Sequence, residues 1–187
     1  MTKSLAPYRD ILDDWERVLA FAKIVFTSRL FTGNGAPQSA EHMALLMLTA
    51  RDLGIPMMSA VELIPIVMGK PTLSPRGALA LVHRSGELKA LRVEDSAPGE
   101  PPSCTVYMER SNGVSYETTW TLEMAKKAGL YKAGGGWDHY PVNMCRARAI
   151  GYAVDVVFPD IQGGLKRADE FGADIDREGN VIYDITP

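Results

Sequence analysis

A run of basic and aromatic residues between positions 126 and 140 has the residue types of a single-strand DNA surface. Its members are Lys126, Lys127, Tyr131, Lys132, Trp137 and Tyr140. Lysines neutralise phosphates, and aromatic rings stack on bases without reading their sequence. The competing interpretation is that Trp137 and Tyr140 anchor the hydrophobic core, which is a frequent role of large aromatic residues. Residue types alone leave both interpretations open.

Two arginines, Arg146 and Arg148, follow within a segment that is predicted to be helical from Pro141 to Val157. At about 100° per residue they lie roughly 200° apart around the helix, so they cannot both face one flat surface. Few acidic residues stand near them in the sequence. We therefore expect one arginine to reach a ligand and the other to reach a neighbouring or partner carboxylate.

Three further basic residues, Lys70, Arg76 and Arg84, are weaker candidates for DNA contact. Lys70 and Arg76 flank a predicted strand-to-helix turn, and the first N–H groups of the helix that Ser74 caps could hold a phosphate. The alternative is that both are solvated charges of a turn. Arg84 stands near the C-terminus of the same helix, where a cation is favourable without any ligand.

Motifs for nucleotide binding are missing. The segment Gly69-Lys70-Pro71-Thr72 departs from a P-loop, because Ile64 stands where the upstream glycine is required and Pro71 separates the lysine from the threonine.

The three histidines, His42, His83 and His139, have no metal-ligand spacing with one another or with the cysteines. No pairing of a nucleophile with a base is recognisable either.

The segment Glu87-Leu88-Lys89 has the E-x-K spacing of some metal-dependent nucleases. The acidic residue that should precede it on a strand is missing, because the nearest earlier acid is Glu62. Chance explains the match better. We therefore predict a protein that is not an enzyme and that uses no cofactor or metal.

Length and composition fit one domain with a real core. The chain has 187 residues, of which 46% are hydrophobic and 23% are charged. No window is apolar enough for a transmembrane helix, and the N-terminus lacks the apolar core of a signal peptide. Cys104 and Cys145 are far apart and form no C-x-x-C motif, so two free thiols in a reducing cytoplasm are expected.

Charge is unevenly distributed along this acidic chain, whose net charge is -3. Residues 122–150 contain five basic and two acidic residues, a net of +3, whereas residues 151–187 contain three basic and eight acidic residues, a net of −5. A basic segment before an acidic tail is compatible with a local anion site. The alternative is that both segments are solvated faces.

The elements that must position these residues follow from periodicity and capping residues. Helices are expected at 10–31, 39–53, 59–63, 74–84, 121–128 and 141–157, and strands at 64–68, 88–93, 104–109 and 115–121. Residues 32–37 and the Gly-rich segment 131–136 are expected to be loops, the second of them flexible. This order predicts an α+β fold with a small antiparallel sheet and helices on one side.

The predicted domain organisation has three parts: a flexible start at 1–9, a core domain at 10–165 and an acidic tail at 166–187. The tail is poor in apolar residues, so we expect it to be partly disordered or docked on a partner. The helix at 39–53 is apolar nearly all round and must be buried in the domain or against another subunit. The first two helices thus favour an oligomer.

One ordered set of motifs carries a family resemblance. Its central part consists of Trp137, Tyr140, Pro141, Met144, Arg146, Ala147, Arg148, Ala149, Ile150 and Ala153, followed by Phe158, Pro159, Asp160, Gly163, Gly164 and Leu165. Upstream, and in the same order, stand Leu53-Gly54-Ile55-Pro56, Gly69-Lys70-Pro71-Thr72-Leu73-Ser74 and Arg84-Ser85-Gly86. Over roughly residues 40 to 165 the chain resembles the RecT family of phage single-strand DNA annealing proteins.

The resemblance implies a RecT/Red-beta-like annealing core, encoded by a phage or prophage, that pairs complementary strands without ATP during homologous recombination. Such proteins assemble as rings or helical filaments on single-stranded DNA and on the annealed duplex intermediate. They act with a partner exonuclease, and a host single-strand binding protein is a possible further partner. The resemblance assigns Arg146, Arg148 and the preceding lysines to DNA contact.

Two alternatives remain beside this interpretation. An oligomeric structural or adaptor protein on the same fold would assemble without nucleic acid and show no salt-sensitive DNA binding. A metal-dependent nuclease would cleave DNA with a divalent ion and lose activity in Glu87→Ala.

Overall fold

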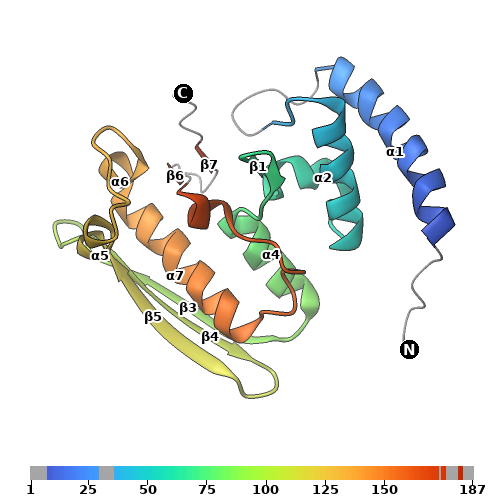
Figure 1. The fold of residues 1–187 in the computed structure, drawn as a ribbon. Coiled ribbons are helices and arrows are strands. Elements are labelled where there is room, and N and C mark those ends of the chain that lie inside the picture. The colour runs from blue at the N-terminus through green and yellow to red at the C-terminus, as the bar shows by residue number, and fades with distance from the viewer. Residues whose placement is uncertain (1–7, 30–35, 173, 176–180, 183–187) are drawn as a thin grey trace.

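A computed structural model describes residues 8–29, 36–172, 174–175 and 181–182 of the chain (Figure 1). The helices are α1 (Tyr8–Thr27), α2 (Ala40–Asp52), α3 (Met57–Leu63), α4 (Pro75–Ser85), α5 (Leu122–Lys127), α6 (Gly136–His139), α7 (Pro141–Val157) and the 3-10 helix η1 (Ala168–Phe171). The strands are β1 (Ile66–Val67), β2 (Lys70–Pro71), β3 (Leu88–Asp95), β4 (Ser103–Arg110), β5 (Ser115–Thr121), β6 (Asp174–Ile175) and β7 (Val181–Ile182).

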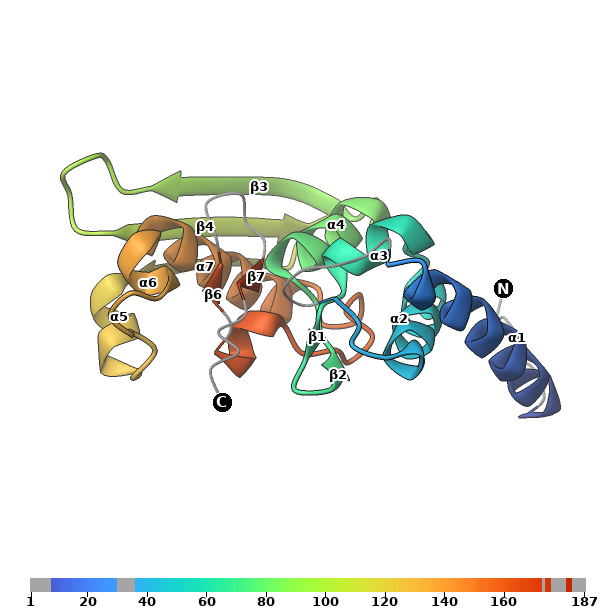
Figure 2. The ribbon, with the colours of Figure 1, turned by 90° about the horizontal axis from the view of Figure 1, so that it is seen from above.

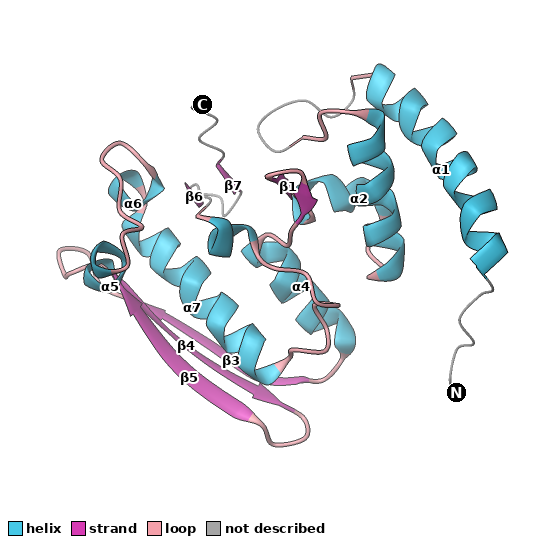
Figure 3. Cartoon of the chain, in the orientation of Figure 1, coloured by secondary structure: helices cyan, strands magenta, loops and turns pink. Residues whose placement is uncertain are grey.

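The main sheet is antiparallel, with the strand order β3-β4-β5. Burial alternates along β4, where Cys104, Val106 and Met108 are buried and the residues between them are more exposed. One face of the sheet is therefore in the core. Helices α4 and α7 lie on that face, and none of the described helices lies on the other face (Figures 2 and 3). The predicted α+β class, with helices on one side of a small antiparallel sheet, is confirmed.

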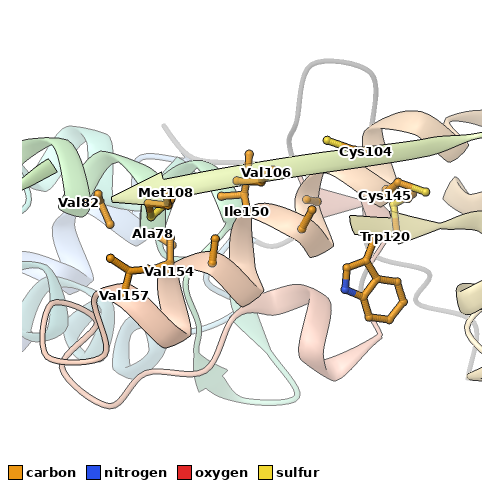
Figure 4. Close-up of a cluster of buried hydrophobic side chains, with 14 of the residues drawn as sticks. Ala78, Val82, Cys104, Val106, Met108, Trp120, Cys145, Ile150, Val154 and Val157 are labelled. Atoms are coloured by element: carbon orange, nitrogen blue, oxygen red, sulfur yellow. The ribbon is translucent and has the colours of Figure 1, made fainter. Parts of the chain in front are cut away.

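Helix α7 is the centre of the core. It packs against β4 and β5 and also contacts α4, so side chains on more than one of its faces are buried (Figure 4). Cys145, Ala149 and Ala153 of this helix are buried, whereas Tyr152 and Val156 are exposed. The small residues of α7 allow this close packing on several sides.

The starts of α2, α4, α5 and α7 are where the local sequence placed them. The hydroxyl groups of Ser39, Ser74 and Thr121 each accept a hydrogen bond from the backbone N–H three residues later, which satisfies one of the free donors of α2, α4 and α5. Pro141 is the first residue of α7, as predicted, and Gly86 ends α4 with φ 72°. These helix boundaries depend only on contacts between residues that are close together in the sequence.

The segment from Ile64 to Ser74 differs from its prediction. The single strand predicted at 64–68 is instead a short hairpin of β1 and β2, in which Val67 pairs with Lys70. Met68 and Gly69 form the turn with positive φ values of 50° and 75°. Strands of two residues form few cross-strand contacts. They are also too short for their composition to show where each strand begins and ends.

Helices α1 and α2 form an antiparallel pair at one end of the molecule (Figures 1 and 2). Between them lies a small separate core of Ala22, Met43, Ala44 and Met47, with partly buried Trp15 and Val18 against it. Leu45 of α2 is exposed in the single chain, so the domain does not bury every face of this helix, and its burial against another subunit stays a prediction. Phe31, the predicted end of the first helix, the loop residues 32–35 and most of the predicted N-terminal segment lie outside the described residues.

The chain does not detach from the domain after Leu165. The backbone of Arg167 forms a bridge with Leu73, and the side chains of Arg167, Ala168 and Asp169 are buried. Residues 166–172 of the predicted acidic tail are instead docked on the domain of the same chain, where Arg167 and Asp169 are buried as ion pairs. Residues 173, 176–180 and 183–187 of that tail lie outside the described residues. In the part of the chain that the structure describes, no helix has the length and hydropathy to cross a membrane.

Candidate nucleic-acid interface

The basic and aromatic residues near position 130 do gather on one part of the molecule. We call the exposed group formed by Lys126, Lys127, Lys132 and Tyr140 the basic end surface. The first two belong to the last turn of α5, the third to the following loop, and Tyr140 to the junction of α6 and α7. Helices α5 and α6 lie together at the end of the molecule opposite α1 (Figure 1).

Asp138 holds the loop between α5 and α6 in one conformation. Its carboxylate accepts a hydrogen bond from the Tyr131 hydroxyl at 2.8 Å and another from the backbone N–H of Gly134 at 3.0 Å. The bond from Gly134, followed by the bond from Tyr131, lowers the pKa of Asp138, so the carboxylate is ionised at neutral pH. Lys126 Nζ lies 5.1 Å from the Tyr131 ring centre. The loop is therefore braced by its own residues, contrary to the predicted flexibility.

The aromatic pair of the sequence motif is divided between core and surface. Trp137 is 3% exposed and packs in the main hydrophobic core, so its ring faces are not available for base stacking. Tyr140 is 37% exposed, and its ring lies 6.2 Å from that of His139. The proposed DNA contact of Trp137 is corrected to a core role, while Tyr140 remains a surface candidate.

Arg146 is bound to a carboxylate of the sheet. Its Nε donates to Asp95 at 3.0 Å, and a second guanidinium N–H donates to the other oxygen of the same carboxylate. Burial raises the pKa of Asp95, but hydrogen bonds from Arg146 and Cys104 and the charge of Arg146 together lower it. The pair is partly exposed, and the charge of Arg146 is balanced within the chain.

Arg148 is buried, with 7% of its surface exposed. Its guanidinium donates to the backbone oxygen of Asp169, lies 3.4 Å from the Asp169 carboxylate and stacks 5.7 Å from the Trp120 ring centre. The expectation that the two arginines point in different directions is confirmed. Both contact carboxylates of this chain, and the expectation that one of them reaches a ligand stays a prediction.

Arg167 is a second buried arginine beside Asp169, and its role was not predicted from the sequence. The side chain of Arg167 donates to Asp169 at 3.1 Å and to Asp155 at 2.5 Å, and it passes over Gly151 in the middle of α7. A glycine inside an otherwise regular helix is the feature that could have revealed the close approach of another group.

The phosphate site proposed at the start of α4 is excluded by packing. The Ser74 hydroxyl already accepts the N–H of Gly77 at 3.0 Å, and the backbone oxygen of Leu63 accepts the N–H of Ser74. A Cβ atom at Gly77 would lie only 2.4 Å from that same oxygen. The end of α3 therefore occupies the space in front of this helix terminus.

The remaining basic candidates lie away from the basic end surface. Lys70 and Arg76 are exposed on β2 and on the first turn of α4, and Arg84 is exposed on its last turn, beside Gly54. These elements are separate from α5 and α6 in both views of the fold (Figures 1 and 2). The structure therefore does not bring Lys70, Arg76 and Arg84 together with the lysines near position 130.

The E-x-K segment is engaged in structural ion pairs. Glu87 pairs with Arg110 at 2.5 Å, and Lys89 pairs with Glu109 at 2.7 Å. Both pairs join β3 and its preceding turn to β4. Among the residues that the structure describes, no three His, Cys, Asp or Glu side chains form a group that could hold a metal ion.

Comparison with protein-family models and with curated proteins finds no match for this chain. The likeness to the RecT family therefore rests on the motif residues quoted above. The structure gives several of them packing roles: Trp137 and Phe158 are buried in the core, Arg148 contacts Asp169, and Asp160 binds Arg110 at 2.7 Å. In this chain the motif residues mainly form the scaffold around α7.

Proposed function

We propose that this protein binds single-stranded DNA and promotes annealing of complementary strands without ATP, as a RecT-like protein of phage-type recombination. The observation that supports this proposal is the basic end surface. Among the described residues, Lys126, Lys127 and Lys132 form no ion pair with a carboxylate, whereas Arg146 and Arg148 each do. Three exposed lysines that form no ion pair, at the same end of the molecule as the exposed Tyr140, suit a phosphate backbone with bases that stack nearby.

Annealing requires no covalent step. It requires that one strand be held by its phosphates while its base edges stay free to pair, and many copies are needed to keep the strand extended. In this proposal the lysines supply the phosphate contacts and Tyr140 supplies a stacking face. Arg146 and Arg148 act through the scaffold, by holding α7 against β3 and against the segment 167–169. A homo-oligomeric ring or filament and a partner exonuclease belong to the same proposal.

The test measures pairing of two complementary fluorescent oligonucleotides without ATP, at several salt concentrations. We expect wild type to accelerate pairing at low salt. The double variant Lys126→Ala/Lys132→Ala should bind single-stranded DNA more weakly and lower the slope of log affinity against log salt by about 1.4, because each lost phosphate contact contributes about 0.7.

The matched control is Lys89→Ala/Arg92→Ala, which removes the same charge from β3. Its salt slope should equal that of wild type. Folded wild type that fails to accelerate pairing at low salt would refute the proposal. An equal loss in both double variants would show that net charge, and not the basic end surface, governs binding.

One observation favours a second candidate, an oligomeric adaptor with little DNA binding. Both arginines of the family motif are neutralised by carboxylates of the same chain, and the whole chain has a net charge of -3. The adaptor would assemble in the absence of nucleic acid, and its assembly would not change when the basic end surface is altered. The same salt series separates the two functions.

A further inference from the structure

Helix α1 has two apolar faces, of which the domain uses only one. The inner face packs on α2 through Trp15, Val18 and Ala22. On the other side Phe21 and Ile24 are 50% and 68% exposed. We call the face formed by Arg17, Ala20, Phe21, Ile24 and Ser28 the outer α1 face; these residues recur at three- and four-residue steps. A shallow depression lined by Ile24, Lys23, Thr27 and Ser28 lies on this side of the helix.

Charge is divided between the two halves of α1. Residues 8–16 contain one basic residue, Arg9, and four acidic residues, a net of −3. Residues 17–27, the rest of the helix, contain Arg17 and Lys23 and no acidic residue, a net of +2, and Arg29 follows just after the helix. The helix dipole accounts for acidic residues only in the first turn and basic residues only in the last. Glu16 and Arg17 lie well inside the helix, so the division needs another explanation.

We propose that the outer α1 face is a two-fold interface in which the α1 helices of two copies of this chain pack antiparallel. Antiparallel packing sets the acidic half of each helix against the basic half of the other, whereas parallel packing would set like charges together. With the two-fold axis near Phe21, the aromatic and aliphatic side chains of both copies meet at the centre. Lys23 of each copy then lies within one helical turn of Glu16 of the other.

Each copy contributes the same surface to this interface, so two copies complete it and no further copy can join there. A ring or filament needs a different, head-to-tail contact. The inference therefore does not depend on the proposed annealing activity. The position of the helix pair agrees with such a role, because α1 lies at the end of the molecule with α2 as its main packing partner, and the described residues leave Phe21 and Ile24 exposed (Figures 1 and 2).

Sedimentation velocity of the full chain without DNA tests the proposal. Wild type should show a dimer that dissociates on dilution, and Phe21→Glu/Ile24→Glu should weaken the dimer by about tenfold or more. The matched control is Val114→Glu/Val156→Glu, which adds the same charge at two other exposed apolar positions and should leave the dimer unchanged. Circular dichroism checks that both variants are folded.

Cross-linking of single-cysteine substitutions then tests the orientation. In the antiparallel arrangement, Phe21→Cys lies at the two-fold axis and should form a covalent dimer with itself, whereas Arg29→Cys should not. The native Cys104 and Cys145 are buried and give little background. Dimerisation that survives Phe21→Glu/Ile24→Glu, a wild type that stays monomeric at about 0.1 mM, or efficient cross-linking of Arg29→Cys with itself would each overturn the proposal. Loss of annealing with an intact dimer would refute only the proposed function.

Discussion

The guanidinium group of Arg167 lies directly against the backbone of Gly151 in the middle of α7. A methyl group at position 151 would be 2.1 Å from Arg167 Nε and 2.4 Å from its Cζ. Arg167 is almost fully buried there, and it binds Asp155 and Asp169. A residue from the predicted acidic tail thus fills a space that the central helix leaves open by carrying a glycine.

This contact predicts that Gly151→Ala destabilises the protein. A glycine inside a helix normally costs about 1 kcal/mol relative to alanine, so α7 by itself would gain from the substitution. Here the added methyl group displaces Arg167 from its carboxylates, and we expect the free energy of unfolding to fall by about 2 kcal/mol. Urea denaturation followed by tryptophan fluorescence measures the change.

The sign of the stability change caused by Gly151→Ala tests whether Arg167 lies against this glycine. In an Arg167→Met background the guanidinium is gone, so the further change Gly151→Ala should cost much less than it does in wild type. A stabilising effect of Gly151→Ala in the wild-type background would mean that Arg167 does not occupy this position in solution.

Asp169 is expected to be among the residues most sensitive to substitution. It is fully buried between Arg148 and Arg167, so Asp169→Ala leaves two buried guanidinium groups without this partner. Removal of one partner from a buried ion pair costs about 3–5 kcal/mol, and we expect a loss of that order in the free energy of unfolding. Glu109→Ala, which removes a partly exposed carboxylate paired with the exposed Lys89, is the matched control and should change stability little.

Acid should break the contact between β3 and α7 at Arg146. Burial raises the pKa of Asp95, but the hydrogen bonds from Arg146 and Cys104 and the charge of Arg146 together outweigh it, so the pKa is below its usual value. A lowered folded-state pKa stabilises the fold above the unfolded pKa of about 3.9, and this contribution disappears as pH falls through the folded-state value. In Arg146→Gln the Asp95 pKa should rise.

Carbon-detected NMR of the Asp95 carboxyl group between pH 2 and pH 6 measures that shift directly. Asp160, which binds Arg110 and also has a lowered pKa, provides an internal control that should not change in Arg146→Gln. An unchanged Asp95 titration in the variant would show that Arg146 does not contact this carboxylate.

The two thiols should be unreactive in the folded protein. Burial is the main cause that raises the pKa of Cys104 to about 12 and that of Cys145 to about 11, so almost no thiolate is present at pH 8. We expect a thiol-specific reagent to label neither residue within minutes at pH 8, and both of them once urea unfolds the chain. Rapid labelling of one thiol without denaturant would place that cysteine at the surface.

Much of the fold could be predicted because its information is local. The capping hydroxyls of Ser39, Ser74 and Thr121 and the proline at the start of α7 act on N–H groups within three residues. The three strands of the main sheet follow from alternation of side chains and from the Ser111–Gly113 turn. For these elements, neighbouring residues in the sequence are also the residues that interact.

The candidate site could be predicted only in part, since charge at a position does not reveal its partner. The exposure of Lys126, Lys127 and Lys132 was expected, because all three belong to one short helix and the loop that follows it. Trp137 and Tyr140 are three residues apart, yet one is in the core and the other at the surface. Only the packing of α6 against α7 separates their roles.

The sequence by itself determined which residues start, continue and end most of the helices and strands, and it determined the excess of basic residues before position 150. Only the tertiary structure decided which of those charges remain available. Arg146 meets Asp95 from 51 residues away, and Arg148 meets Asp169 from 21 residues away. Such pairs form because the sheet register and the return of the chain along α7 bring them together, and a contact of that kind leaves no periodic pattern in the sequence.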